Sequence, residues 1–282
     1  MGRLRTKMEQ DLAIRGLGKG TTGNYLRAVE GLTRHYGRAP DTLTLDEVKG
    51  YLAHLRQARQ VSLSRVASVV TGLRFFYEIT LDRPRREFFL PSPKLPQSQP
   101  HVLSRQEVER VLTTTTHRRD RALFMTAYAA GLRVGELVRL QVRHIDSERM
   151  LLRLEHTKGP KDRYALLSER LLAELRAYWR VFQPPVWLFC GQPPEHPLCV
   201  RTVQRHYLAA KQRAGITKPG GIHGLRHAFA THMVEAGVDL STIQRLLGHS
   251  HIETTTRYLH LAPRTLARRG SICDLLAFTP TP

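Results

Sequence analysis

Apolar side chains recur at helical spacing through the first 80 residues. Three stripes follow the 3.6-residue period, within Tyr25–Tyr36, Val48–Leu55 and Val66–Tyr77. Thr21–Thr22 precede the first stripe as candidate N-caps, and Thr44–Glu47 reads as a capping box before the second. The pattern predicts four short helices whose apolar faces form a core.

A second set of periodic segments begins after residue 100. Another capping box, Ser104–Glu107, precedes a buried helix from Asp120 to Ala130, which Gly131 should end. Two apolar runs, Met150–Glu155 and Arg163–Leu167, flank a Gly-Pro turn and predict a hairpin. Further helices are predicted over Leu171–Trp179, over Val200–Ala214 and in three short pieces from His223, with Asp239 and Ser250 as caps.

Prolines separate the two sets. Four of them fall within residues 91–100 and forbid a continuous helix or a central strand there. We therefore expect a helical domain over residues 1–85, a stiff linker over 86–100, and a second domain over 101–282. The fold class predicted is mainly α with a small antiparallel β-sheet.

The charge suggests a polyanionic partner, usually nucleic acid, while a ribosome-associated protein or a basic composition with no single partner are the alternatives. The chain has 282 residues and a formal net charge of +20. Residues 1–100 hold 17 basic and 9 acidic side chains, net +8, and residues 101–282 hold 27 and 15, net +12. Both halves are basic, which suits two lobes gripping duplex nucleic acid better than a single basic tail.

Other features exclude several classes of protein. The three cysteines lack the spacing of a disulfide scaffold or a cysteine-rich zinc site. No apolar run approaches the roughly 20 residues of a membrane span, and the N-terminus lacks an apolar signal core. We expect a cytoplasmic, nucleoid-associated protein of bacterial type that does not bind a membrane.

Several polar residues sit where turns would present them to a cleft. Arg133 follows Gly131, and Glu136 three residues on could hold the backbone or a basic neighbour. His223 and Arg226 share one face of a predicted helix. Lys158 lies at the hairpin tip, His249 follows Gly248, and Tyr258 follows a run of threonines. Each also has an ordinary interpretation, as a solvated cation, a capping histidine or a packed tyrosine.

A zinc site at His223 and His227 is disfavoured. No cysteine lies near the pair, and no glutamate stands between them as in the helical zinc-protease motif. Taken together, the polar residues could instead perform phosphoryl transfer without a metal, since guanidinium groups can neutralise phosphate oxygens. We predict no metal and no cofactor.

The order of these segments resembles the tyrosine recombinases, the phage integrase family. The matching segments are the Gly-Leu-Arg-x-x-Glu-Leu box over 131–137, Lys158, the His-x-x-Arg box over 223–226, the Leu-Gly-His box over 247–249, and Tyr258 nine residues after His249. The resemblance implies a SAM-like core-binding domain at the N-terminus and an α+β catalytic domain after it.

The resemblance also implies a role for each residue. Arg133 and Arg226 would bind the scissile phosphate, and His249 would donate a hydrogen bond to it. Tyr258 would attack, giving a 3′-phosphotyrosyl bond, while His223 assists proton transfer and Lys158 protonates the leaving 5′ oxygen. Strand exchange would pass through a Holliday junction, with a dimer on each pair of half-sites and a tetramer in synapsis, without ATP.

Several alternatives stay open. The chain resembles compact Xer-like and mobile-element recombinases, so integration, excision or transposition of a mobile element and resolution of chromosome or plasmid dimers are all possible roles. A catalytically silent DNA-binding protein of the same fold and a type IB topoisomerase are the alternative functions. A tail helix with apolar residues from Leu266 to Phe278 could pack on its own domain or on a neighbouring protomer.

The residues that read bases carry no motif. Candidates are basic side chains on the helices predicted over Ser62–Tyr77 and Val200–Ala214. They are Arg65, Arg74, Arg201, Arg205 and Lys211.

Overall fold

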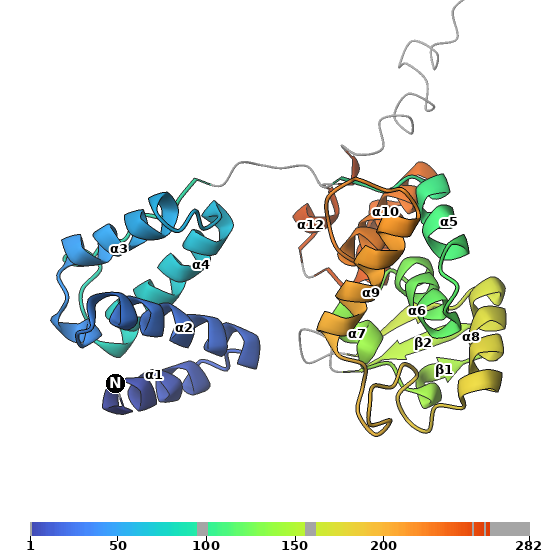
Figure 1. Cartoon of the computed structure of the whole chain (residues 1–282), viewed down its shortest axis with the longest axis horizontal. Coiled ribbons are helices and arrows are strands. Elements are labelled where there is room, and N and C mark those ends of the chain that lie inside the picture. Colours follow the sequence, from blue (N-terminus) through green and yellow to red (C-terminus); the bar gives the residue numbers. More distant parts are fainter. Residues whose placement is uncertain (1, 95–100, 156–161, 250, 257, 260–282) are drawn as a thin grey trace, which may run out of the picture. The chain divides into compact units, whose positions relative to one another are not determined.

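The computed structural model describes residues 2–94, 101–155, 162–249, 251–256 and 258–259. The chain divides into two compact units, Met1–Ser98 and Gln99–Pro282 (Figure 1). Lys158, Ser250 and the predicted tail helix lie outside the described residues. Within the described residues, no helix combines the length and the apolar character that a membrane span requires.

The first unit is a small helical bundle, as predicted. Its helices are α1 (Gly2–Ile14), α2 (Lys19–Tyr36), α3 (Leu45–Gln57) and α4 (Leu63–Arg74), with a 3₁₀ turn at Pro40–Thr42 and a π-helical turn at Phe75–Thr80. Helices α2 and α4 cross closely at Gly72, where an added Cβ would lie 3.0 Å from the Cβ of Ala28. The stripes seen in the sequence form the core, which includes Leu12, Val29, Leu32, Val70 and Leu73.

The N-termini of the helices in the first unit show which of the predicted N-cap residues are correct. Thr44 forms the capping box expected of it, since its side chain accepts from the Glu47 backbone N–H and its own N–H donates to the Glu47 carboxylate. The prediction for Thr21–Thr22 is wrong, because α2 already begins at Lys19 with Gly18 as N-cap. The Thr22 hydroxyl donates to the Leu17 carbonyl, so it does not cap an N–H.

The segment before the prolines packs on the first unit. Phe88 and Leu90 are buried in its core, and the Phe88 ring stacks on Tyr77 with ring centroids 3.9 Å apart. The Arg74 Nε donates to the Leu90 carbonyl at 2.7 Å. Residues 86–90, expected in the linker, are therefore part of the bundle, because prolines prevent a helix without preventing burial of the apolar residues between them.

The second unit combines helices with a three-stranded antiparallel sheet. The strands are β1 (Ile145–Asp146), β2 (Leu151–Leu154) and β3 (Arg163–Leu166), in the order β1-β2-β3 with Leu152 opposite Ala165. The described helices are α5 (Arg105–Thr113), α6 (Arg118–Ala129), α7 (Val134–Val138), α8 (Glu169–Phe182), α9 (Val200–Arg213), α10 (His223–Glu235), α11 (Leu240–Leu247) and α12 (Glu253–Thr256), with a 3₁₀ turn at Val142–His144.

Helix α6 holds the centre of this unit. It contacts α5, α7, α8, α9 and α10, and Leu123, Phe124 and Ala127 on it are fully or almost fully buried. Contact on several sides explains why its sequence reads as a buried helix. A smaller cluster of Phe229, Ile243, Leu247 and Tyr258 joins α10, α11 and the segment after α12.

Candidate active site

Two glycines set the backbone of the site. Gly131 follows α6 with φ +60°, and Gly248 follows α11 with φ +62°, a region that favours glycine. A Cβ on Gly131 would lie 2.6 Å from the Phe229 ring, and a Cβ on Gly248 would lie 2.6 Å from Cδ of Arg163. Both turns therefore need glycine for conformation and for close packing. The turn at Gly131 leads to Arg133, and the turn at Gly248 leads to His249.

Three arginines converge on the end of helix α11. Leu246, Leu247 and Gly248 are consecutive, and each carbonyl accepts from a different arginine. Arg163 Nη1 donates to Leu246, Arg226 Nη2 donates to Leu247 at 2.7 Å, and Arg133 Nη2 donates to Gly248 at 3.0 Å. Carbonyls at a helix C-terminus lack intrahelical partners and carry the negative end of the helix dipole. The end of α11 is therefore a scaffold for cations.

Glu136 holds the same three arginines from the other side. Its side chain is 6% exposed and accepts from Arg133 Nη1 at 2.8 Å and from Arg163 Nη2 at 2.6 Å, while Arg226 Nη1 lies 3.8 Å away. Burial alone would raise the pKa of Glu136, but the hydrogen bond and charge of Arg163 and the bonds from Arg133 lower it. One carboxylate facing three guanidinium groups leaves a formal charge of +2.

Arg226 is the most buried member of the group. Its side chain is 1% exposed, and Nη1 donates to the Gly131 carbonyl at 2.7 Å. Burial, helped by the charge of Arg133, lowers the pKa of Arg226 to about 9. The guanidinium is still protonated at neutral pH, so the site keeps a buried cation whose cost is offset by its hydrogen bonds.

Tyr258 lies against the histidines. It is 3% exposed, and its hydroxyl shares a hydrogen bond of 3.1 Å with Nδ1 of His227. The His223 ring meets the His227 ring edge-on with centroids 4.6 Å apart. The His249 ring runs nearly parallel to that of Tyr258, at 6.4 Å, and its Nδ1 shares a hydrogen bond of 2.9 Å with the Thr255 hydroxyl.

Burial and the neighbouring arginines together lower the pKa values of two histidines. Partial burial, followed by the charges of Arg226 and Arg133, lowers the pKa of His249 to about 4. The same causes lower the pKa of His223, although part of its ring stays open to solvent. The His249 ring is therefore neutral at neutral pH and can donate from one nitrogen and accept at the other, and the lowered pKa of His223 favours its neutral form.

The structure brings together five of the six residues named from the sequence. Arg133, Arg226 and His249 meet at the end of α11, and His223 and Tyr258 meet through His227. The sixth, Lys158, lies outside the described residues. Among the described residues, no group of three or more His, Cys, Asp or Glu side chains is arranged to hold a metal ion.

Sequence reasoning missed Arg163 and the contact of His227 with Tyr258. Arg163 shares the inward face of β3 with buried Ala165, while Tyr164 and Leu166 on the other face are exposed. An arginine on the buried face of a strand requires a buried acceptor, and period-two alternation was the signal that could have indicated one. Glu136 does both things expected of it, accepting from the Arg133 backbone and from basic neighbours.

The candidate base-reading residues differ in exposure. Arg65, Arg201 and Arg205 are exposed, and Arg74 is half-buried on Leu90. Lys211 must be corrected, because it is 6% exposed and its Nζ donates to the carbonyls of Lys218 and Gly220. Its ammonium closes the turn after α9 and cannot also reach base edges.

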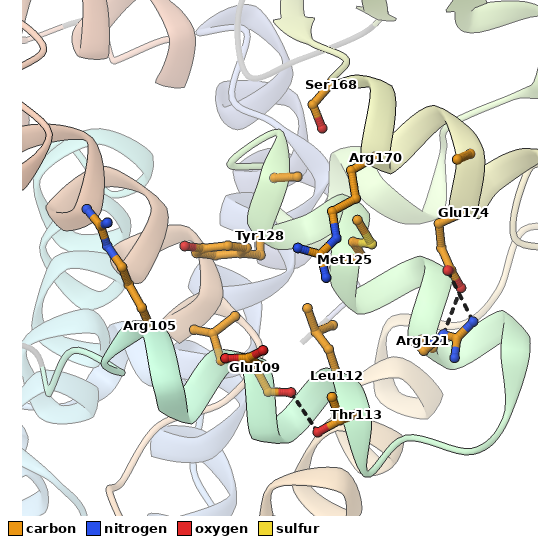
Figure 2. A pocket seen from close by; sticks show the side chains of 13 residues that line it. Arg105, Glu109, Leu112, Thr113, Arg121, Met125, Tyr128, Ser168, Arg170 and Glu174 are labelled. Atoms are coloured by element: carbon orange, nitrogen blue, oxygen red, sulfur yellow. Dashed lines mark hydrogen bonds and ion pairs between the residues drawn. The ribbon is translucent and has the colours of Figure 1, made fainter.

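A hollow of about 720 Å³ lies elsewhere in the second unit, between α5, α6 and α8 (Figure 2). Arg121 pairs with Glu174 at one end of it, with bonds of 2.8 and 3.1 Å. Tyr128 on its wall shares a hydrogen bond of 2.9 Å with His232 of α10. None of the six residues named from the sequence lines this hollow.

Two sequence families match the chain, one on each unit. Residues 101–265 match the phage integrase family, and residues 4–87 match the phage integrase N-terminal SAM-like domain. Together these matches cover most of the chain.

Individual proteins agree with the family matches. The chain is 40% identical to integrase/recombinase y4qK of Sinorhizobium fredii, over 99% of this chain and 92% of that protein. It is 36% identical to tyrosine recombinase XerA of Thermococcus onnurineus, over 85% of this chain and 86% of that protein. Among solved structures, a lambda integrase tetramer bound to a Holliday junction shares the fold, with a TM-score of 0.75 at 18% identity over 91% of this chain and 76% of that chain.

Proposed function

The chain belongs to the phage integrase family of tyrosine site-specific recombinases, and from this premise we propose that Tyr258 is its nucleophile. The substrate is duplex DNA. The Tyr258 hydroxyl attacks the scissile phosphorus, a bond forms between tyrosine oxygen and phosphorus, and the bond from phosphorus to the 5′ oxygen breaks. The products are a 3′-phosphotyrosyl ester and a free 5′-hydroxyl. In the second step the 5′-hydroxyl of a partner strand attacks the same phosphorus, a new phosphodiester bond forms, the bond from phosphorus to the Tyr258 oxygen breaks, and that oxygen takes up a proton.

The observation that carries this proposal is the formal charge of +2 at the end of α11. A phosphodiester carries one negative charge, and a second develops on the equatorial oxygens as the tyrosine attacks. Arg133 and Arg226 are fixed by Glu136 and by backbone carbonyls, so little reorganisation is needed when that charge appears. Such preorganised cations favour the transition state more than the ground state.

Protons move through side chains of the same site. The Tyr258 proton leaves towards His227, which contacts the hydroxyl, with His223 beside it. A tyrosine of ordinary pKa near 10 needs such an acceptor and a cationic surrounding to react at neutral pH. Lys158 supplies the proton to the leaving 5′ oxygen, and neutral His249 donates a hydrogen bond to the phosphate.

The chemistry needs neither ATP nor a divalent cation. The phosphotyrosyl ester conserves the energy of the phosphodiester bond, and guanidinium groups supply the positive charge that metal ions supply in other phosphoryl-transfer sites. We expect strand cleavage to continue in EDTA. Loss of cleavage in EDTA that Mg²⁺ restores would contradict this part of the proposal.

The assembly we propose is a dimer on paired half-sites and a tetramer in synapsis. The fold shared with the lambda integrase tetramer on a Holliday junction supports it. For the biological role, the name of the relative with 40% identity, integrase/recombinase, favours integration or excision of a mobile element over dimer resolution. Sequencing the DNA beside the gene tests this, since an adjacent element end supports it and a lone dimer-resolution site opposes it.

The decisive experiment separates cleavage from binding. Suicide duplexes with randomised cores and a nick are incubated with the protein, and covalent adducts are resolved on denaturing gels and sequenced. On the recovered duplex, Tyr258→Phe should form no adduct and bind as tightly as wild type, because only the nucleophile oxygen is lost. Tyr164→Phe, on an exposed tyrosine of β3, is the matched control and should form adduct normally.

The alternatives predict other outcomes. An adduct in Tyr258→Phe would overturn the assignment, and a wild-type protein that binds without any adduct would be a silent DNA-binding protein. Relaxation of supercoiled plasmid DNA without a selected site would indicate a topoisomerase.

A further inference from the structure

Arg163 lies at the same carboxylate, Glu136, as Arg133 and Arg226, and it binds the carbonyl next to theirs at the end of helix α11. It lies outside the segments that carry the family resemblance. We propose that Arg163 is a positioning residue that keeps Glu136 from neutralising Arg133 and Arg226, and that fixes the end of α11 which both arginines use. The proposal rests on the function proposed above and adds a residue to its machinery.

The bonds of Arg163 join two elements of the site. The side chain is 10% exposed, Nη2 donates to Glu136 Oε2 at 2.6 Å, and Nε donates to Glu136 Oε1 at 3.4 Å. Nη1 donates to the Leu246 carbonyl. One planar fork thus ties the acid on α7 to the last turn of α11, a geometry that a lysine cannot reproduce.

The arm of Arg163 also supports the turn after α11. Its Cδ would lie only 2.6 Å from a Cβ on Gly248, so the Arg163 side chain packs directly on the glycine backbone. The Gly248 carbonyl holds Arg133, and His249 follows it. Loss of the Arg163 side chain would leave a gap under this turn. The Gly248 carbonyl, Arg133 and His249 would then lose the support that they share.

The charge count gives the main reason for a positioning role. With Arg163 present, three guanidinium groups face one carboxylate and the site carries +2. Without it the formal charge falls to +1, and Glu136 is free to pair with Arg226, now 3.8 Å away, in competition with the phosphate. The bonds described above already engage three of the five N–H donors of Arg163, so its main role is to direct the other two arginines.

The test compares two scissile groups. One suicide duplex carries the natural phosphodiester and the other carries a methylphosphonate, in which a methyl replaces one charged oxygen. A site with too little positive charge cleaves the anionic phosphodiester slowly. On the neutral methylphosphonate the same deficit should slow cleavage much less. The variants are Arg163→Ala and Arg163→Lys, with Arg153→Ala as control, since Arg153 is an exposed arginine of the neighbouring strand paired to Asp162.

We expect Arg163→Ala to slow adduct formation on the phosphodiester about 100-fold, as for a misplaced catalytic group, with DNA affinity nearly unchanged. Arg163→Lys should fall between it and wild type. On the methylphosphonate the difference from wild type should shrink to about a few-fold, as it should for Arg226→Ala, because the need for positive charge is reduced. Arg153→Ala should behave as wild type on both duplexes.

Two results would overturn the inference. One is cleavage of the phosphodiester by both Arg163 variants at the wild-type rate. The other is an equal loss on both duplexes, which indicates a purely structural role, and thermal melting of each variant checks this. If Arg163→Ala does not fold, the same comparison with Arg163→Lys decides. A wild-type protein lacking any Tyr258-dependent adduct would instead refute the proposed function.

Discussion

The positions of the three arginines in this site depend on one side chain, the carboxylate of Glu136. A buried carboxylate is costly unless it is paired, and here it accepts from Arg133 and Arg163 with Arg226 close by. The pairing works in both directions, because Glu136 also keeps three guanidinium groups close together that would otherwise repel one another. The excess of two positive charges then remains for a phosphate.

His249 gives a prediction for stability against pH. Its pKa is about 4 in the folded chain and about 6.5 in an unfolded one. Between these values the unfolded chain binds a proton that the folded chain does not, so stability falls as the pH falls through this window. We expect the Tm of wild type to drop more steeply from pH 7 to pH 5 than that of His249→Asn.

Calorimetry of both proteins at several pH values measures this difference. His223 and His232 have lowered pKa values too and contribute to the slope in both proteins, so the difference between the curves isolates His249. Parallel curves would contradict a neutral His249 beside the arginines.

Site residues could be predicted from the sequence where they stand in a local motif, but not where their partners lie far away along the chain. Arg133, Arg226 and His249 stand in recognisable local motifs, so the sequence could name them. The alternation along β3 could have marked Arg163 as facing inward, but its partners Glu136 and Leu246 lie 27 and 83 residues away, and no local pattern records those contacts. Lys211 was misassigned because its acceptors, two backbone carbonyls, carry no side-chain signal.

At the scale of elements, the C-terminus of α11 is the main structural device. Its last carbonyls are normally left to solvent or to a cap, and here three arginines use them. Asp239 caps the start of helix α11 and accepts from the Thr242 N–H as expected, and Gly248, in the left-handed conformation, caps its end. The helix is short, so both ends matter to its placement.

Gly248→Ala tests this device. The left-handed φ costs alanine about 1 kcal/mol, and the added Cβ must displace the Arg163 arm. We expect a modest loss of Tm together with a loss of adduct formation that is larger than the change in stability explains. Gly135→Ala is a suitable control, since a Cβ there meets nothing within 4 Å. Normal cleavage by Gly248→Ala would contradict this prediction, because the site would then tolerate displacement of the Arg163 side chain.

Elements were predictable where a local signal existed. The capping boxes at Thr44 and Ser104 marked true helix starts. Strand β1 has two residues, too short for any periodic pattern, so only β2 and β3 of the sheet were predicted. Phe88 and Leu90 were placed in the linker because proline content obscured their burial in the first core.

At the scale of the whole molecule, both units carry positive charge and both match domains of DNA recombinases. Binding should therefore weaken as salt rises, with a slope of about −0.9 in log affinity per phosphate neutralised. We expect Arg65→Ala and Arg205→Ala each to make the slope shallower by about one, because both side chains are exposed. Fluorescence anisotropy titrations at several salt concentrations measure it.

Lys211→Met provides the contrast within the same helix as Arg205. It should lower Tm, because the ammonium closes a turn, yet leave the salt slope unchanged. A slope that is flat for wild type would mean that the net charge of +20 does not serve DNA binding.

The most direct test of the central claim is to identify the protein atom joined to DNA. The adduct from wild type and a suicide duplex is digested with protease and nuclease, and the residual nucleotide is located by tandem mass spectrometry. We expect a nucleotide attached through its 3′-phosphate to the Tyr258 side-chain oxygen. A nucleotide on any other residue, or one attached through a 5′-phosphate, would contradict it.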